Sequence, residues 1–240
     1  MQCVILAGGL ATRMRPITEK IPKLLIPIEG KPFAYHQLHW LKKKGVTEVL
    51  LSIGYLGEQV REYVGDGKKF GIKVEYVDEG TNLMGTAGAL RLALDEDKLH
   101  DNFLVTYGDS FLPVDYQDIF SQFLFCGKPA LMTVFKNEGK WDSSNVWFEN
   151  NTVVLYDKHG KQPENAKKLQ YIDYGLSALT KEVIEEQVPA KTKADLAALF
   201  YDLSMKGELA GYLVKERFYE IGSSSGLADF TQYIAHNAQQ

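Results

Sequence analysis

The chain has 240 residues, of which 45% are hydrophobic and 24% are charged, and its formal net charge is −4 at pH 7. This composition is typical of a globular protein with a sizeable core and excludes a disordered chain. Charges of like sign are not gathered in long runs, which excludes a nucleic-acid-binding footprint, and no segment reaches the roughly 18 apolar residues of a membrane helix. Cys3 and Cys126 predict free thiols in a reducing compartment. We therefore expect a soluble, cytoplasmic protein that binds neither nucleic acid nor a membrane.

Short β-rich apolar runs alternate with amphipathic segments through the first half of the chain. The apolar runs predict strands at residues 3–7, 48–54, 73–79 and 103–110. The amphipathic segments predict helices at residues 33–45, 57–65 and 85–94. Pro32 precedes the first of these helices and Gly45 ends it. This alternation with short connections predicts an α/β fold, in which a Rossmann-like, mixed and mostly parallel central sheet carries helices on both faces.

The second half of the chain is less regular but remains rich in strands. Its pattern predicts strands at residues 129–137, 171–180 and 210–223, a helix at 193–207, and a hairpin at 145–158. The hairpin turns at Asn150 and Asn151, and residues 161–168 form a polar loop. No linker rich in proline, glycine or serine interrupts the chain, so we expect one domain over residues 1–240.

A glycine-flanked loop that carries two cations follows the first predicted strand. Ligands of open parallel sheets bind beyond the carboxyl ends of the strands, where this loop lies. Gly8 and Gly9 have no side chains, so their amides can donate to phosphate oxygens. Arg13 supplies a fork of donors and Lys23 a compact point charge. A plain tight turn is the alternative, because the spacing matches neither the dinucleotide-binding nor the P-loop pattern.

The complete string G-G-x-x-T-R-M-x-P-x-T-x-x-x-P-K resembles the signature of the sugar-1-phosphate nucleotidyltransferases, also called nucleotide-sugar pyrophosphorylases. The resemblance covers nearly the whole chain and implies the nucleotide-diphospho-sugar transferase fold. It also implies that the loop wraps the triphosphate of a nucleotide, and that Arg13 and Lys23 stabilise the transition state. The nucleotide-binding residues implied here are Ala7, Gly8, Gly9, Thr12 and Arg13. The family usually has a third glycine at Ala11, so we expect either a negative φ there or a loop that absorbs the strain.

Two carboxylates at the ends of β-rich runs are candidate metal ligands. Asp109 follows a strand and Gly108, and Glu220 follows a strand and precedes Ile221 and Gly222. Nucleotidyl transfer gathers several negative charges around one phosphorus, which calls for Mg²⁺ held by carboxylates. The resemblance implies that both residues bind Mg²⁺ and that Asp109 also contacts the nucleotide, although relatives more often have Asp at the second position.

Two further groups of residues are candidates for the base and the sugar phosphate. The segment 79–90 opens a helix with glycines, which suits either a flat base or close packing. The resemblance implies nucleotide binding by Glu79, Gly85 and Thr86. Lys158 follows the hairpin, and the resemblance implies that it contacts the sugar phosphate. The other implied sugar-phosphate residues are Asn145, Asp173 and Gly175.

The resemblance implies an enzyme that transfers a nucleoside monophosphate from an NTP to a sugar 1-phosphate, releasing pyrophosphate. Residues 1–125 would form the nucleotide-binding half and residues 126–240 the sugar-phosphate-binding half. The chain is similar to short forms such as mannose- and heptose-1-phosphate guanylyltransferases and N-acetylmuramate-1-phosphate uridylyltransferase, so the sugar and the base stay open, as does a homodimer. One alternative is a cytidylyltransferase that acts on a phosphorylated amino alcohol. Another is a catalytically silent relative that senses nucleotide sugars.

Overall fold

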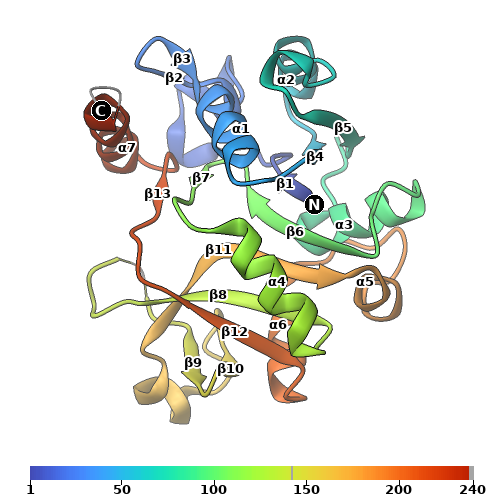
Figure 1. Ribbon diagram of the computed structural model, residues 1–240, viewed down its shortest axis with the longest axis vertical. Helices are drawn as coiled ribbons and strands as arrows, with labels where there is room; N and C mark the ends of the chain where they lie inside the picture. The colour runs from blue at the N-terminus through green and yellow to red at the C-terminus, as the bar shows by residue number, and fades with distance from the viewer. Residues whose placement is uncertain (142, 238–240) are drawn as a thin grey trace. The chain divides into compact units, whose positions relative to one another are not determined.

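The computed structural model describes residues 1–141 and 143–237. The chain divides into two compact units, each built from segments far apart in the sequence. The first unit comprises Met1–Leu83, Thr106–Pro113 and Arg217–Gln240, and the second comprises Met84–Val105 and Val114–Glu216. Figure 1 shows the helices and strands of both units, and the expected single functional domain over residues 1–240 stays a prediction.

Three parallel strands form the sheet of the first unit. They are β1 (Gln2–Leu6), β4 (Glu48–Ile53) and β5 (Lys73–Asp78), in the order β5-β4-β1. In the register, Ile5 lies beside Leu51, which lies beside Tyr76. The continuous apolar runs of β1 and β4 are almost completely buried, as expected of parallel strands covered on both faces. These strands confirm the parallel sheet predicted from the alternation of strands and helices along the chain.

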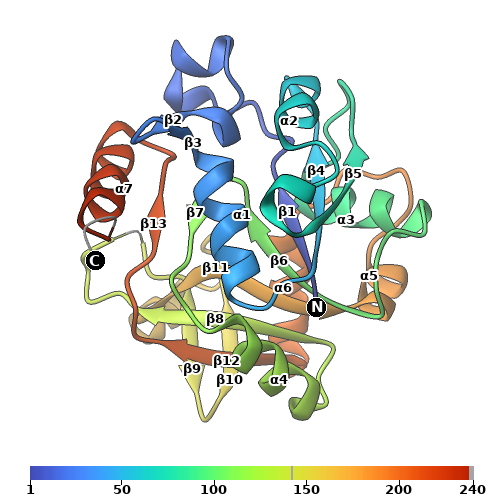
Figure 2. The same cartoon turned by 45° about the horizontal axis from the view of Figure 1, so that its top comes forward.

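Helices and short pairings complete the first unit. The helices are α1 (Phe33–Lys43), α2 (Gly57–Val64) and α7 (Ser224–Asn237). The short strands are β2 (Pro27–Ile28), β3 (Lys31–Pro32), β7 (Ser110–Phe111) and β13 (Tyr219–Glu220), paired β2–β3 and β7–β13. Both views show α7 running beside β13 (Figures 1 and 2). Phe230 of α7 is buried, with its ring 5.3 Å from that of Phe33 and 4.9 Å from that of Phe111. An aromatic cluster therefore holds α7 in place.

The second unit is built on a mixed sheet in the order β11-β8-β12-β10-β9. Its strands are β8 (Ala130–Lys136), β9 (Val146–Glu149), β10 (Thr152–Tyr156), β11 (Tyr171–Thr180) and β12 (Leu209–Val214). Strand β8 is antiparallel to β11 and parallel to β12. The helices of this unit are α3 (Gly85–Asp95), α4 (Tyr116–Cys126), α5 (Lys181–Gln187) and α6 (Leu196–Met205), with α4 and α6 on opposite faces of the sheet (Figure 1). Strand β6 (Asn102–Tyr107) begins in this unit and ends in the first.

Most predicted elements are present, and the exceptions have physical reasons. The hairpin turn at Asn150 and Asn151 is confirmed, with φ of 49° and 57°, which asparagine tolerates better than most residues. The single strand predicted at 210–223 is wrong, because β12 and β13 are separate strands that belong to different units. The polar loop at 161–168 includes a short 3₁₀ helix, Pro163–Lys168.

Helices α4, α5 and α7 were not predicted from the sequence. Helix α4 begins at an N-cap, where the Asp115 carboxylate accepts from the amides of Gln117 and Asp118, each at 3.0 Å.

Among the residues that the structure describes, no helix has the length and apolar character needed to cross a bilayer.

Candidate active site

The Glu79 carboxylate, which directly follows β5, lies against the glycine turn that follows β1. A Cβ on Gly8 would lie 2.4 Å from Glu79 Oε1, whereas a Cβ on Gly9 would meet nothing within 4 Å. Ser52 Oγ donates to Glu79 Oε1 at 3.0 Å. Glu79 therefore approaches Gly8 so closely that its carboxylate would have to shift for any other residue at position 8, and the structure brings these two predicted nucleotide-binding residues together. Ala7 lies at the end of β1, where its amide donates to Ser52 O at 2.9 Å.

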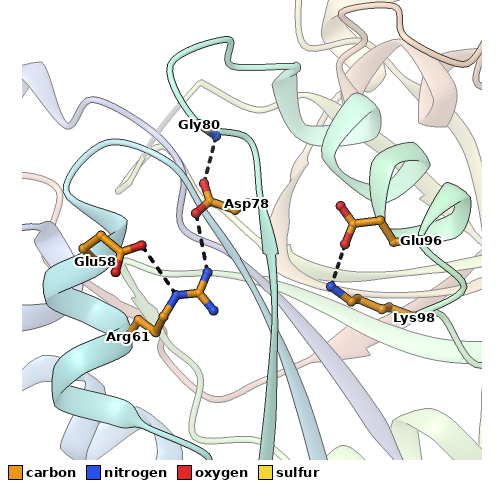
Figure 3. Close-up of polar contacts among 6 residues, drawn as sticks. All are labelled: Glu58, Arg61, Asp78, Gly80, Glu96 and Lys98. Carbon is orange, nitrogen blue, oxygen red and sulfur yellow. Dashed lines mark hydrogen bonds and ion pairs between the residues drawn. The ribbon is translucent and has the colours of Figure 1, made fainter.

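Contacts of Asp78 hold the backbone on both sides of Glu79. Asp78 Oδ1 accepts from the Gly80 amide at 2.8 Å, and Oδ2 accepts from Arg61 Nη2 at 3.5 Å (Figure 3). Arg61 also lies 3.7 Å from Glu58, one turn earlier on α2. The Glu96–Lys98 pair in the same figure is a separate contact of the second unit. The segment that carries Glu79 is thus anchored to α2.

The loop that follows the glycine turn contains a residue in the left-handed conformation. Ala11 has φ 49° and ψ 41°, so the expectation of a negative φ is wrong and the loop absorbs the strain. The Ala11 carbonyl accepts from the Met14 amide at 3.0 Å and from the buried Thr18 hydroxyl at 2.8 Å. These two hydrogen bonds stabilise a conformation that alanine rarely adopts. Thr12 begins the exposed turn that follows.

The two predicted catalytic cations lie around Asp109. Lys23 Nζ is 2.7 Å from Asp109 Oδ2, and the two side chains are only 19% and 22% exposed. The Arg13 guanidinium and the Asp109 carboxylate face the same small space beside Gly222, where a Cβ would lie 3.3 Å from Arg13 Nη2 and 3.6 Å from Asp109 Oδ2. Arg13, Lys23 and Asp109 therefore form one charged cluster within the first unit.

The pairing of β7 with β13 brings the backbone of the second predicted metal ligand, Glu220, beside the turn that carries Asp109. Glu220 pairs with Ser110, and the Ile221 amide donates to Asp109 O at 2.9 Å. Asp109 Oδ1 accepts from Ser110 Oγ at 3.2 Å. No group of three histidine, cysteine or acidic residues able to hold a metal occurs in the described parts of the chain. Two carboxylates nevertheless suit Mg²⁺, which commonly binds one or two of them together with substrate phosphates.

In the second unit, the start of α3 is packed against the segment that leads into α6. A Cβ on Gly85, whose φ is +75°, would lie 2.5 Å from Ala194 O. The same carbonyl accepts from the amides of Ala87 and Gly88 at 3.0 and 3.1 Å. Close packing, the alternative considered for these glycines, therefore accounts for Gly85, and its contact with a base stays a prediction.

Thr86 joins the two helix starts of the second unit through Asp195. Its hydroxyl donates to Asp195 Oδ1 at 2.9 Å and accepts from the Leu196 amide at 2.7 Å. Burial tends to raise the pKa of Asp195, but hydrogen bonds from Ala197 and Thr86 and the charge of Lys158 bring this pKa below its usual value. Sequence reasoning missed Asp195, although an aspartate directly before an apolar helix is an N-cap signal.

The remaining predicted residues form a network on β11 and the segment before β9. Asn145 Oδ1 accepts from the Asp173 amide at 3.1 Å, and Asp173 Oδ1 accepts from the Gly175 amide at 2.9 Å. Burial raises the pKa of the Asp173 carboxyl, and the Gly175 amide and the charge of Lys158 offset part of that rise. The structure thus gathers all four predicted sugar-phosphate residues within the second unit.

Comparison with known proteins shows the family to which this chain belongs. A family model described as nucleotidyl transferase matches residues 2–236, so the chain belongs to the nucleotidyl transferase family. It is 33% identical over 187 residues to D-glycero-alpha-D-manno-heptose 1-phosphate guanylyltransferase of Campylobacter jejuni, covering 78% of this chain and 79% of that protein. It is 34% identical over 234 residues to UTP–glucose-1-phosphate uridylyltransferase of Synechocystis, covering 91% of this chain and 58% of that protein.

A third relative and two solved structures extend the comparison. A low-salt glycan biosynthesis nucleotidyltransferase of Haloferax volcanii is 31% identical over 79% of this chain, which spans only 53% of that relative. HddC of Yersinia pseudotuberculosis, solved with GMP-PN, has a TM-score of 0.79 at 24% identity and covers 97% of this chain and 99% of its own. The inositol-1-phosphate CTP transferase of T. maritima has a TM-score of 0.76 at 21% identity and covers 98% and 94%. These structures share the fold, which confirms the predicted α/β nucleotide-diphospho-sugar transferase architecture.

Proposed function

We propose that the protein transfers a nucleoside monophosphate from an NTP to a sugar 1-phosphate, producing an NDP-sugar and pyrophosphate for cell-surface polysaccharide or nucleotide-sugar biosynthesis. The observation that carries this proposal is the 2.7 Å ion pair of Lys23 with Asp109, with Arg13 beside it. It combines cations for phosphate oxygens with a carboxylate for a divalent cation. Two relatives named above act on heptose 1-phosphate and glucose 1-phosphate, which supports a sugar 1-phosphate acceptor.

The proposed chemistry is an in-line displacement at the α-phosphorus. An oxygen of the sugar phosphate forms a bond to this phosphorus, and the bond to the bridging oxygen of the β-phosphate breaks, so pyrophosphate leaves with the electron pair. Arg13 neutralises the leaving pyrophosphate, and Lys23 stabilises the charge that develops at the α-phosphate. Catalysis therefore rests on positioning and electrostatic stabilisation, without a covalent enzyme intermediate.

We assign the binding of Mg²⁺ to Asp109 and Glu220. Glu220 pairs with Ser110, the residue that follows Asp109, and Asp109 Oδ2 already binds one cation, the ammonium group of Lys23. When bound, Mg²⁺ would neutralise phosphate charge and polarise the α-phosphate. With Asp109 engaged in holding the metal, the ammonium group of Lys23 would be available for the phosphate.

The other predicted residues complete the proposed binding sites. For the nucleotide these are Ala7, Gly8, Gly9, Thr12, Glu79, Gly85 and Thr86; for the sugar phosphate they are Asn145, Lys158, Asp173 and Gly175. Both cysteines are free, with Cys3 buried and Cys126 exposed, which suits work in the reducing cytoplasm.

A pyrophosphate-release assay tests the proposal. Each of the four NTPs is paired with mannose, glucose, heptose and N-acetylmuramate 1-phosphates, and with phosphocholine as the amino-alcohol alternative. We expect release that requires both a sugar 1-phosphate and Mg²⁺ and that stops in EDTA. We also expect Mg²⁺ with the active NTP to raise the melting temperature more than either does alone.

The other outcomes separate the alternatives. Release only from CTP with phosphocholine would identify a cytidylyltransferase for amino alcohols. Stabilisation by an NDP-sugar without any pyrophosphate release would identify a silent sensor. Full activity in EDTA would refute the assignment of Asp109 and Glu220 to a metal.

A further inference from the structure

Gln37 of α1 is a buried polar side chain that contacts the turn carrying Asp109. It is only 3% exposed. Its amide nitrogen Nε2 donates to Tyr107 O at 2.9 Å and to Ser110 O at 2.8 Å. These carbonyls lie on the two sides of Gly108 and Asp109, so one side-chain amide bridges the ends of the turn. A primary amide has two hydrogens, which matches these two acceptors.

A second residue of α1 contacts the same segment one turn later. Trp40 Nε1 donates to Leu112 O at 2.9 Å. Helix α1 therefore binds three backbone carbonyls between residues 107 and 112, all in the first unit. Hydrogen bonds from α1 therefore fix the backbone of the turn that carries Asp109.

Packing alone does not explain why glutamine occupies position 37, because the oxygen of its side-chain amide gains nothing there. Gln37 Oε1 is buried and has no hydrogen-bond partner among the described residues. A buried acceptor without a partner costs free energy, whereas methionine or leucine would fill a similar volume without that cost. The two donated hydrogen bonds are thus the property that glutamine adds at this position.

We propose that Gln37 is a positioning residue that holds the Asp109 carboxylate in place for a divalent cation, an inference that rests on the proposed function. The Asp109 side chain itself is held by Lys23 at Oδ2 and by Ser110 at Oδ1. A metal held by Asp109 would compete with the contact to Lys23. The backbone fixed by Gln37 would still keep the carboxylate oriented, and metal sites depend on such support of their ligands.

The test compares Gln37→Met with a matched control, Gln2→Met. Methionine has a similar length but cannot donate. Gln2 is also a buried glutamine of the first unit, 1% exposed, and its Nε2 donates to Glu48 at 3.1 Å. This contact lies at the start of β1 and β4, whereas the glycine turn follows the end of β1. Mn²⁺ alone is titrated into each protein, and free Mn²⁺ is measured by its EPR signal. We expect the Kd for Mn²⁺ to rise at least about tenfold in Gln37→Met and to stay within about twofold in Gln2→Met.

Two further measurements separate positioning from general destabilisation. The Mg²⁺ concentration for half-maximal activity should rise in Gln37→Met, while KM for the sugar phosphate stays unchanged. In an Asp109→Asn background, Gln37→Met should have no further effect on Mn²⁺ binding, because the ligand that it positions is gone. Gln37→Glu, which keeps the shape but loses the amide donors, should weaken Mn²⁺ binding in the same way and serves if Gln37→Met does not fold.

Each outcome bears on one of the two proposals. Unchanged Mn²⁺ affinity in Gln37→Met, or an equal loss in Gln2→Met, would overturn the role of Gln37 and leave the proposed function intact. Failure of both Gln37 variants to fold would assign Gln37 to folding and would also overturn the positioning role. A wild-type protein that binds Mn²⁺ no better than Asp109→Asn would instead refute the metal assignment.

Discussion

The ion pair between Lys23 and Asp109 allows a double-mutant cycle in which stability and activity can be separated. At 2.7 Å, two unit charges attract by about 6 kcal/mol at an effective dielectric constant of about 20. The side chains are 19% and 22% exposed, so screening and the cost of desolvation remove most of this energy. Exposed ion pairs contribute about 0–1 kcal/mol to stability, and loss of one partner of a buried pair costs about 3–5 kcal/mol. The Lys23–Asp109 pair is partly buried, so we expect a coupling energy between these ranges, about 2 kcal/mol.

Urea denaturation of the wild type, Lys23→Met, Asp109→Asn and the double variant measures this coupling. Each single variant should lose about 2 kcal/mol, and the double variant should lose about the same amount rather than twice as much. Activity should behave differently, because Lys23→Met removes charge stabilisation in the transition state and should lower kcat at least about 100-fold. Lys20→Met, at an exposed lysine of the same loop, should keep kcat within about twofold.

Two results would contradict this reasoning. A coupling energy below about 0.5 kcal/mol would show that the pair is too well solvated to act as a stand-in for a bound cation. Turnover of Lys23→Met close to the wild-type value at saturating substrates would remove Lys23 from the proposed chemistry.

Three other perturbations have defined outcomes. Ala11→Gly should raise stability by about 0.5 kcal/mol in urea denaturation, because relief of the left-handed strain outweighs the added freedom of the unfolded chain; a clear loss would contradict the strain. Lys158→Ala should raise KM for the sugar phosphate at least about tenfold while KM for the NTP stays within about threefold, and equal effects on both would refute its assignment to the acceptor. Burial raises the pKa of Asp173 from 3.8, so the folded state binds this proton more tightly and loses stability as pH rises through the raised pKa. Asp173→Asn should therefore raise the urea midpoint at pH 7.5, with a gain that shrinks as the pH is lowered; a gain that is constant with pH would contradict this.

Local patterns in the sequence predicted the secondary structure well where the signal lies within a few residues. The buried runs of β1 and β4, the start of α1 after Pro32 and the hairpin turn at Asn150 and Asn151 are all of this kind. Their physical causes are the periodicity of burial and the backbone preferences of proline and asparagine, which act over one turn of chain. The resemblance to a family of nucleotidyltransferases also follows from the sequence, because it depends on the order of residue types in one loop.

Contacts between distant residues were decided only by the tertiary structure. Gln37 lies in an amphipathic helix, where a polar side chain ordinarily faces solvent, yet it is buried against carbonyls 70 and 73 residues away. The pairing of Lys23 with Asp109 spans 86 residues, and that of Thr86 with Asp195 spans 109. Such pairings depend on which strands and turns become neighbours, and no local periodicity encodes that order. The local sequence therefore predicted most of the elements and the chemical groups available, whereas the packing of α1, β7 and β13 decided which of those groups meet around Asp109.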